Sequence, residues 1–213
     1  MRIYIKATQY NHRRAKKNIN KNILFFTFIL FFMSFQTDNT KKVYWHERNI
    51  ITWNDFTQVD KLTNKTDIKI NGDEAAIISC PINSKGLYYD DDGNLVSEVT
   101  TFLNIAESYV INGKQNNHLL KHEQGHFDIS ELYARKIRKE LSMYKFTKFN
   151  IYKMFIKISD RLLKESKRYN DEYDRETNHS INKEKQAEWD KKIAQELAEL
   201  DDYKNVDVIC ILE

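Results

Sequence analysis

A helical pattern that carries histidine on its apolar side constrains this fold most. Between Asn117 and Leu141, large apolar residues recur at helical spacing, at Leu119, Ile129, Tyr133, Ile137 and Leu141. The spacing predicts an amphipathic helix whose apolar stripe faces a core. His122 and His126 fall on the same stripe, so the predicted helix turns two imidazoles inward.

The residues around these histidines form an H-E-x-x-H pattern, "HEQGH". Positions four apart lie on one helix face, so His122 and His126 can both reach an ion about 2 Å away. Glu123 can reach a water on that ion as a general base. Gly125 costs a helix roughly 1 kcal/mol relative to alanine, which suits a backbone that is closely approached. The alternative is a pair of hydrogen-bonded core histidines. His118 lies about 12 Å along the axis from His126, which predicts a surface residue near the helix start.

The chain before this helix has the features of a β-rich half. Three runs predict strands: "NIITWNDF" (49–56), "AAIISCPI" (75–82) and "VTTFLNIAESYVI" (99–111), the last as one strand or two. The segment "DDDGN" (90–94) predicts a turn because of its Asp-Gly content.

The chain after this helix has the features of a helical half. Amphipathic patterns at 151–169 and 189–200 predict two further helices, and "VDVICIL" (206–212) predicts a closing strand. The polar stretch 169–182 has no period, which predicts a loop between the helices. The expected fold class is therefore α+β and zincin-like, with a β-rich N-terminal half packed on a helical half that carries the H-E-x-x-H helix.

The chain's overall excess of basic over acidic residues comes from the N-terminus. The chain has 34 basic and 31 acidic residues; seven of the basic and none of the acidic ones lie in residues 1–35, so the rest has a net charge of −4. Residues 23–35 form an apolar run too short for a bilayer, which needs about 20, but suited to a signal-peptide core. No small-x-small cleavage site follows it. We therefore expect a signal peptide or N-terminal membrane anchor at 1–35, and no nucleic-acid surface.

The remaining boundaries follow from length and composition. Residues 36–47 are polar and predict a linker, and 48–213 predict one metallopeptidase domain. The leader predicts export to the periplasm, cell surface or medium. Export motivates the hypothesis that Cys80 and Cys210, the only cysteines, form a disulfide between the β half and the C-terminal strand. Two buried free thiols are the alternative.

Three segments resemble a bacterial family of predicted secreted zinc-dependent proteases, largely catalogued as a domain of unknown function. They are "LLKHEQGHFDISELYARKIRKEL", the upstream "ITWNDF" and the late "YDRETNH…QAEW", and the resemblance spans about residues 44–204. It implies a zinc metallopeptidase of the cell envelope that acts on a protein or peptide. Ser180 departs from the family pattern, which usually has glycine after the late histidine.

A catalytic zinc has three protein ligands and one open position, so His122 and His126 need a third ligand from elsewhere in the chain. The only histidine beyond the helix is His179, and the resemblance points to the same block. We predict His179 as the third ligand, with Glu165, Asp174 and Glu176 as alternatives. Tyr173 is predicted as a donor to the developing oxyanion.

These features favour a zinc-dependent hydrolase with Glu123 as general base. The alternative is a non-catalytic zinc-binding protein of the envelope with the same fold and an interaction or structural role. An intact glutamate favours the enzyme, because a site without turnover has no chemical need for a base. A helical membrane-associated scaffold would leave His122 and His126 unexplained.

Overall fold

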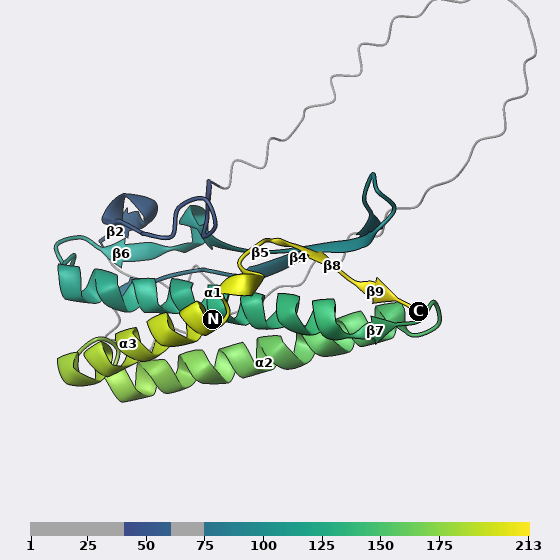
Figure 1. Cartoon of the computed structure of the whole chain (residues 1–213). Coiled ribbons are helices and arrows are strands. Elements are labelled where there is room, and N and C mark those ends of the chain that lie inside the picture. The colour runs from purple at the N-terminus through teal and green to yellow at the C-terminus, as the bar shows by residue number, and fades with distance from the viewer. Residues whose placement is uncertain (1–40, 61–74) are drawn as a thin grey trace, which may run out of the picture.

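The computed structural model describes residues 41–60 and 75–213 (Figure 1). The predicted signal peptide or anchor at 1–35 lies outside these residues, as does the first part of the predicted linker. The described part is α+β, as the sequence predicts: most strands come before residue 112, and three helices follow. No helix in this part of the chain is long and apolar enough to cross a membrane.

The main sheet is built around one long strand. β5 (Leu95–Asn104) pairs antiparallel with β4 (Ile82–Tyr89), β1 (Lys42–Tyr44) and the late β8 (Asp207–Ile209). β5 is almost wholly buried, which agrees with a central strand covered by its neighbours and by a helix.

Two smaller sheets complete the β structure. β6 (Tyr109–Ile111) pairs parallel with β2 (Thr57–Val59) and antiparallel with β3 (Ala76–Ile77). At the other end, β7 (Lys145–Phe146) pairs parallel with β9 (Ile211–Leu212). The closing strand predicted at 206–212 is confirmed as β8 and β9.

The three helices are α1 (Asn117–Met143), α2 (Ile151–Thr177) and α3 (Lys183–Glu199). Asparagine caps two of them: Asn116 accepts a hydrogen bond at the start of α1, and Asn182 does so at the start of α3. α1 is central, because it packs against β5 on one side and against α2 and α3 on the other (Figure 1).

Two apolar clusters hold these layers together. The larger one joins α1 to β5, α2 and α3 through residues that include Val99, Ile129, Leu132, Ile137, Leu162, Trp189 and Ile193. The smaller one lies under the early strands and includes Ile51, Phe56, Cys80, Leu103, Val110, Leu119 and Phe127. α1 contributes to both clusters, which explains why its inward stripe is the clearest periodic signal in the sequence.

A buried ion pair also fixes α1 against the sheet. The guanidinium of Arg138 donates to both carboxylate oxygens of Glu131, at 2.9 and 3.1 Å, and its Nε donates to the carbonyl of Val99 in β5 at 3.0 Å. Both side chains are about 1% exposed. Loss of Glu131 would leave the buried Arg138 guanidinium without its carboxylate partner.

Two predictions for the start of the described chain are corrected. The predicted linker at 36–47 contains β1, which is part of the main sheet. The segment 49–56 is not a strand, because a 3₁₀ helix, η1 (Trp53–Asp55), closes it. The Asp55 carboxylate accepts from the backbone N–H of Thr52 at 2.8 Å and pairs with Arg48, which draws the chain into a turn.

The other strand predictions in the β half are confirmed in part, because most of β4 lies beyond the predicted run 75–82, and the predicted turn is confirmed. The run 75–82 contains β3 and the first residue of β4, and the run 99–111 holds most of β5, a 3₁₀ turn η2 (Ile105–Glu107) and β6. The segment 90–94 is a turn in which Asp90 N–H donates to the carbonyl of Asn94 and Gly93 takes a positive φ of 81°.

The loop predicted at 169–182 is the main error in the helical half. α2 continues through this stretch to Thr177, and only the turn at 178–182 separates it from α3. Its inward positions here include Asn170, Tyr173 and Thr177, which are all buried. Two of these residues are not apolar, so the helix has no hydrophobic period to detect, although its geometry is regular.

The disulfide hypothesis is wrong: Cys80 and Cys210 are both buried free thiols. Cys210 lies beside Leu95, whose carbonyl accepts from its N–H, whereas the residue before Cys80 bonds to Asn104. Leu95 and Asn104 are the two ends of β5, roughly 30 Å apart at strand spacing. A disulfide needs Cα atoms within about 7 Å.

Candidate metal centre

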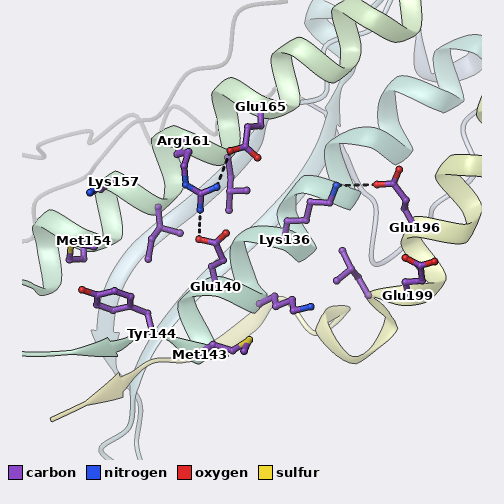
Figure 2. A pocket seen from close by; sticks show the side chains of 14 residues that line it. Lys136, Glu140, Met143, Tyr144, Met154, Lys157, Arg161, Glu165, Glu196 and Glu199 are labelled. Carbon is purple, nitrogen blue, oxygen red and sulfur yellow. Dashed lines mark hydrogen bonds and ion pairs between the residues drawn. The ribbon is translucent and has the colours of Figure 1, made fainter.

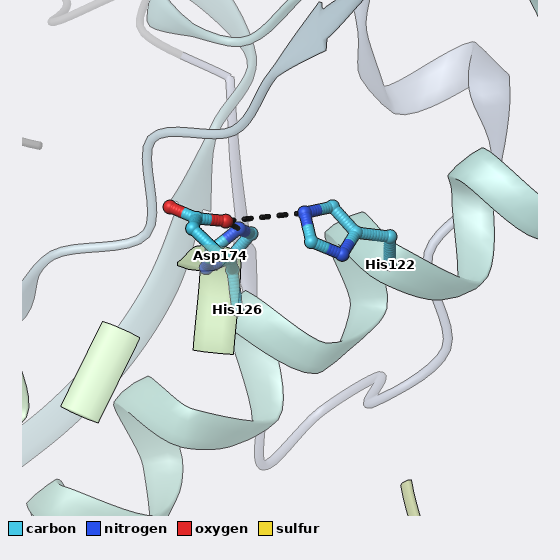
Figure 3. Close-up of side chains that lie close together, drawn as sticks. All are labelled: His122, His126 and Asp174. Atoms are coloured by element: carbon cyan, nitrogen blue, oxygen red, sulfur yellow. Dashed lines mark ion pairs between the residues drawn. The ribbon is translucent and has the colours of Figure 1, made fainter. Parts of the chain in front are cut away.

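The candidate centre lies where α1 faces the last turns of α2. His122 and His126 project from α1, and both are buried. Asp174 projects from α2 between them (Figure 3). These three residues are the one group among the described residues whose ligand atoms could hold a metal ion.

The distances within this group suit a tetrahedral ion. Oδ1 of Asp174 lies 3.2 Å from Nε2 of His122 and 2.9 Å from Nε2 of His126. Ligands about 2.0–2.1 Å from a zinc ion at tetrahedral angles are about 3.3 Å from one another. The donor set of two imidazoles and one carboxylate therefore fits zinc in both chemistry and spacing.

The second ring nitrogens of both histidines have side-chain amide partners. His122 Nδ1 lies 3.0 Å from Oε1 of Gln186 in α3, and His126 Nδ1 lies 2.8 Å from Oδ1 of Asn170 in α2. An amide oxygen only accepts, so each Nδ1 carries the hydrogen. This tautomer leaves both Nε2 lone pairs available for a metal, with the rings held in orientation.

Two further bonds hold these amides in place. Asn170 Nδ2 donates to the carbonyl of Ser166 at 2.9 Å, and Gln186 Nε2 donates to Oδ1 of Asp190 at 2.8 Å. Each amide nitrogen is thereby directed away from its histidine. The amide oxygen is then the atom that faces each imidazole.

Without a metal ion, burial and the contacts between His126 and Asp174 shift the pKa values of both side chains. Burial disfavours a charged His126, but the Asp174 carboxylate opposes burial and raises the His126 pKa to about 9. Burial likewise disfavours the Asp174 carboxylate, but His126 and His122 hold its pKa well below the ordinary range. The negative charge of Asp174 that stabilises an imidazolium here would also stabilise a bound cation.

Glu123 follows His122 on α1 and is 3% exposed. Its charge adds to the effects that raise the pKa of His126, which places its carboxylate near the same centre. The three motif residues His122, Glu123 and His126 are thus buried together on the inward face of α1, as the sequence predicts.

Tyr173 lies beneath the histidines. Its ring stacks on His122, with centroids 4.7 Å apart, and its hydroxyl donates to the His122 carbonyl at 3.0 Å. The same oxygen accepts from Nε2 of Gln186 at 2.6 Å, and the side chain is fully buried. The hydroxyl hydrogen is therefore directed at the backbone and not at a substrate, so the geometry supports a positioning role. The oxyanion role stays a prediction.

Tyr173 also explains Gly125. A Cβ on Gly125 would lie 2.6 Å from Cζ of Tyr173 and closer still to its hydroxyl oxygen. The sequence predicts a close approach to this backbone, and the approaching group is the phenol of Tyr173.

His179, the predicted third ligand, lies beside the group and not within it. Its Nδ1 is 3.9 Å from Oδ1 of Asp174, and its side chain is 49% exposed. It sits in a turn where Asn178, His179 and Ser180 all have positive φ, and His118 Nε2 contacts the Ser180 carbonyl. His118 is therefore near the helix start and outside the centre, as predicted. The assignment of His179 as a metal ligand stays a prediction.

Two of the three acidic candidates for the third ligand are engaged elsewhere. Glu165 pairs with Arg161 at 2.9 Å on the outer part of α2, about 13 Å along the helix from Asp174. Glu176 accepts a hydrogen bond from Nε1 of Trp189 at 2.8 Å. Of the three carboxylates, only that of Asp174 reaches both histidines.

Asn170 and Gln186 were not predicted from the sequence. Gln186 begins the "QAEW" segment quoted for the resemblance, and Asn170 precedes Asp174 by one helical turn. The signal that could have found Asn170 is spacing: on a helix over 169–177, Asn170, Asp174 and Thr177 share one face.

A groove lies away from this centre, between the second half of α1, the first half of α2 and the end of α3 (Figure 2). Several of its charges pair with one another: Lys136 with Glu196, and Arg161 with Glu140 and Glu165. Glu165 lines it, but His122, His126 and Asp174 do not.

Residues 114–180 match the model of a family described as a bacterial protein of unknown function, DUF922. The match spans α1, α2 and the turn that follows, and so includes His122, Glu123, His126 and Asp174. No curated protein and no solved structure matches the chain. The segment that holds all three candidate ligands is therefore similar to DUF922, in agreement with the resemblance to a catalogued domain of unknown function.

Proposed function

We propose that this chain is a zinc-dependent hydrolase, and specifically a metallopeptidase of the cell envelope. One observation carries the proposal: Nε2 of His122, Nε2 of His126 and Oδ1 of Asp174 converge at metal-ligand spacing, with Glu123 buried beside them. The assignment of a peptide as the substrate rests on the H-E-x-x-H arrangement and on the resemblance to the family of predicted zinc-dependent proteases.

In this proposal some residues of the centre bind the ion or orient its ligands, and one residue transfers a proton. His122, His126 and Asp174 hold it, while Gln186 and Asn170 orient the two rings. Zinc bound there would supply Lewis-acid activation of water and of a carbonyl. Asp174 is the third ligand that the geometry favours.

Glu123 is the proton acceptor in this proposal. It follows His122 by one residue, about 100° around the helix, and its charge acts on His126. In this position it can take a proton from a water beside the ion without binding the ion itself. Its burial keeps competing solvent away from the carboxylate.

Substrate access comes from the side of Asp174. This side chain is 30% exposed and His126 is 11% exposed, whereas His122 is 4% exposed. The partly exposed His179 lies at the same opening, where it can contact a substrate or complete the ligand set.

Metal content is the first test. We expect about one zinc per purified chain by elemental analysis, and strong loss in His122→Ala and Asp174→Asn. His46→Ala, which removes a histidine outside the group, is the matched control. Two histidines and one carboxylate also suit iron(II), so iron in place of zinc would contradict the zinc assignment.

Hydrolysis is the second test. Glu123→Gln should keep zinc and the fold but lose at least about a hundredfold in the rate of cleavage of a peptide library. Glu188→Gln, a change of the same chemistry at an exposed position of α3, should have no effect. A wild-type protein that binds zinc and cleaves no peptide would favour the non-catalytic envelope protein.

Export is proposed from the leader alone. A reporter enzyme that is active only outside the cytoplasm should be active when it is fused after residue 40. Activity of a reporter that works only in the cytoplasm, with none from the first reporter, would contradict export.

A further inference from the structure

The surface formed by residues 143–168 exposes basic and large apolar side chains together. Every exposed position between residues 143 and 168 is either basic or large and apolar. The acidic residues of this segment, Asp160 and Glu165, are only partly exposed. We call this the basic-apolar surface; its central residues are Met143, Lys148, Phe149, Tyr152, Lys153 and Ile156.

Its apolar side chains are unusually exposed. Phe149 is fully exposed, Tyr152 is 70% exposed, Met143 64% and Ile156 55%. Tyr152 and Ile156 are one turn apart on α2, and Phe149 precedes that helix. The end of α1, β7 and the start of α2 form one end of the molecule (Figure 1). Four large apolar groups gathered at one tip indicate a contact surface.

Four lysines of this segment have no ion-pair partner among the described residues. No ion pair within the described residues involves Lys148, Lys153, Lys157 or Lys164. Elsewhere on the helices some lysines are paired, as in Lys121 with Asp190, whereas Lys183 and Lys191 on α3 are not paired within the described part of the chain. What distinguishes the surface is that its unpaired lysines stand beside exposed apolar side chains. Because residues 36–213 carry a net charge of −4, the positive charge is a local feature and not a general one.

The neighbouring groove does not account for this pattern. Met143 and Lys157 line it, but the Arg161, Glu140 and Glu165 charges within it pair with one another (Figure 2). The unpaired lysines lie outside these pairs, beside the exposed apolar tip.

We infer that the basic-apolar surface binds the face of a bilayer that contains anionic lipids. Exposed aromatic and aliphatic groups insert at the headgroup level, and lysines around them reach anionic headgroups. An apolar tip ringed by lysine favours a bilayer over a nucleic acid, whose phosphates offer no apolar layer for Phe149 and Met143. Asp174 lies about 33 Å along α2 from Tyr152, so the metal centre is held away from the lipid.

The test uses full chains that differ only at chosen lysines, so any contribution of the leader is common to all of them. Wild type and Lys148→Glu/Lys153→Glu are sedimented with vesicles of phosphatidylcholine, with and without phosphatidylglycerol. Lys183→Glu/Lys191→Glu on α3 makes the same change in net charge outside the surface and is the matched control. Circular dichroism checks that each variant is folded.

We expect wild type and the control to bind anionic vesicles equally, and the surface variant to bind at least about tenfold more weakly. Equal binding of anionic vesicles by the surface variant and the control would overturn the inference.

A second measurement locates the contact. Phe149→Trp places a reporter at a fully exposed position, and its emission should shift to the blue only with anionic vesicles. A shift induced equally by an oligonucleotide or by a soluble acidic peptide, or no shift in the presence of bound vesicles, would also overturn it.

Discussion

The phenol of Tyr173 fills the space that a side chain on Gly125 would need. A Cβ there would lie 2.6 Å from Cζ of Tyr173, which is fully buried and stacked on His122. The glycine of the motif is therefore required by a contact between α1 and α2, and the gain from that contact offsets the loss of helix propensity.

Gly125→Ala should destabilise the protein by about 1–3 kcal/mol, because the buried ring has little room to move. In a Tyr173→Ala background the same change should stabilise by up to about 1 kcal/mol, through helix propensity alone. Urea denaturation of the four proteins measures this reversal of sign. Equal effects in both backgrounds would show that the contact is not the cause.

Asp174→Asn should weaken zinc binding by at least about tenfold, because an amide is a poor substitute for a carboxylate ligand that lies beside two imidazoles. His179→Ala should weaken it less, since His179 Nδ1 lies 3.9 Å from Asp174 and outside the ligand group. Competition with a zinc chelator gives both affinities. The opposite order would support the sequence-based choice of His179.

Asn170→Leu should reduce zinc affinity by about 10–100-fold, because His126 Nδ1 loses the oxygen that orients its ring. Asn170→Asp keeps an acceptor at nearly the same place and should retain most of the affinity. The comparison is made at one pH with the fold monitored by circular dichroism. A similar loss in both variants would indicate a packing role for Asn170.

The metal-free protein should lose stability as the pH rises from about 6.5 to about 9. His126 has an ordinary pKa of 6.5, and Asp174 raises it to about 9 against the effect of burial, so the folded chain holds this proton more tightly than the unfolded chain does. The contribution, at most about 3 kcal/mol, is complete below pH 6.5 and is lost through pH 9.

Zinc should reverse this trend, because a metal binds the deprotonated imidazole and competes with protons. The stabilisation by added zinc should therefore increase from about pH 6 to about pH 9. Thermal unfolding with and without zinc measures both trends. Asp174→Asn should remove the metal-free trend; its persistence in that variant would assign it to another group.

Local sequence patterns were sufficient to predict the elements whose apolar residues recur at a regular spacing. α1 was predictable because its inward residues are mostly apolar and recur every turn. The strand run at 99–111 and the turn at 90–94 were predictable for similar local reasons, whereas the run at 49–56 is not a strand. The pair His122 and His126 follows from helix geometry alone, since a spacing of four places both rings on one face.

Packing between distant segments determined the rest of the centre. The end of α2 had no detectable period, because its inward residues Asn170 and Asp174 face histidines and not an apolar core. The amide of Gln186 reaches His122 from 64 residues away. No local pattern encodes such contacts, because they depend on how the helices pack; the packing brings Asp174 between the two histidines and leaves His179 at the edge.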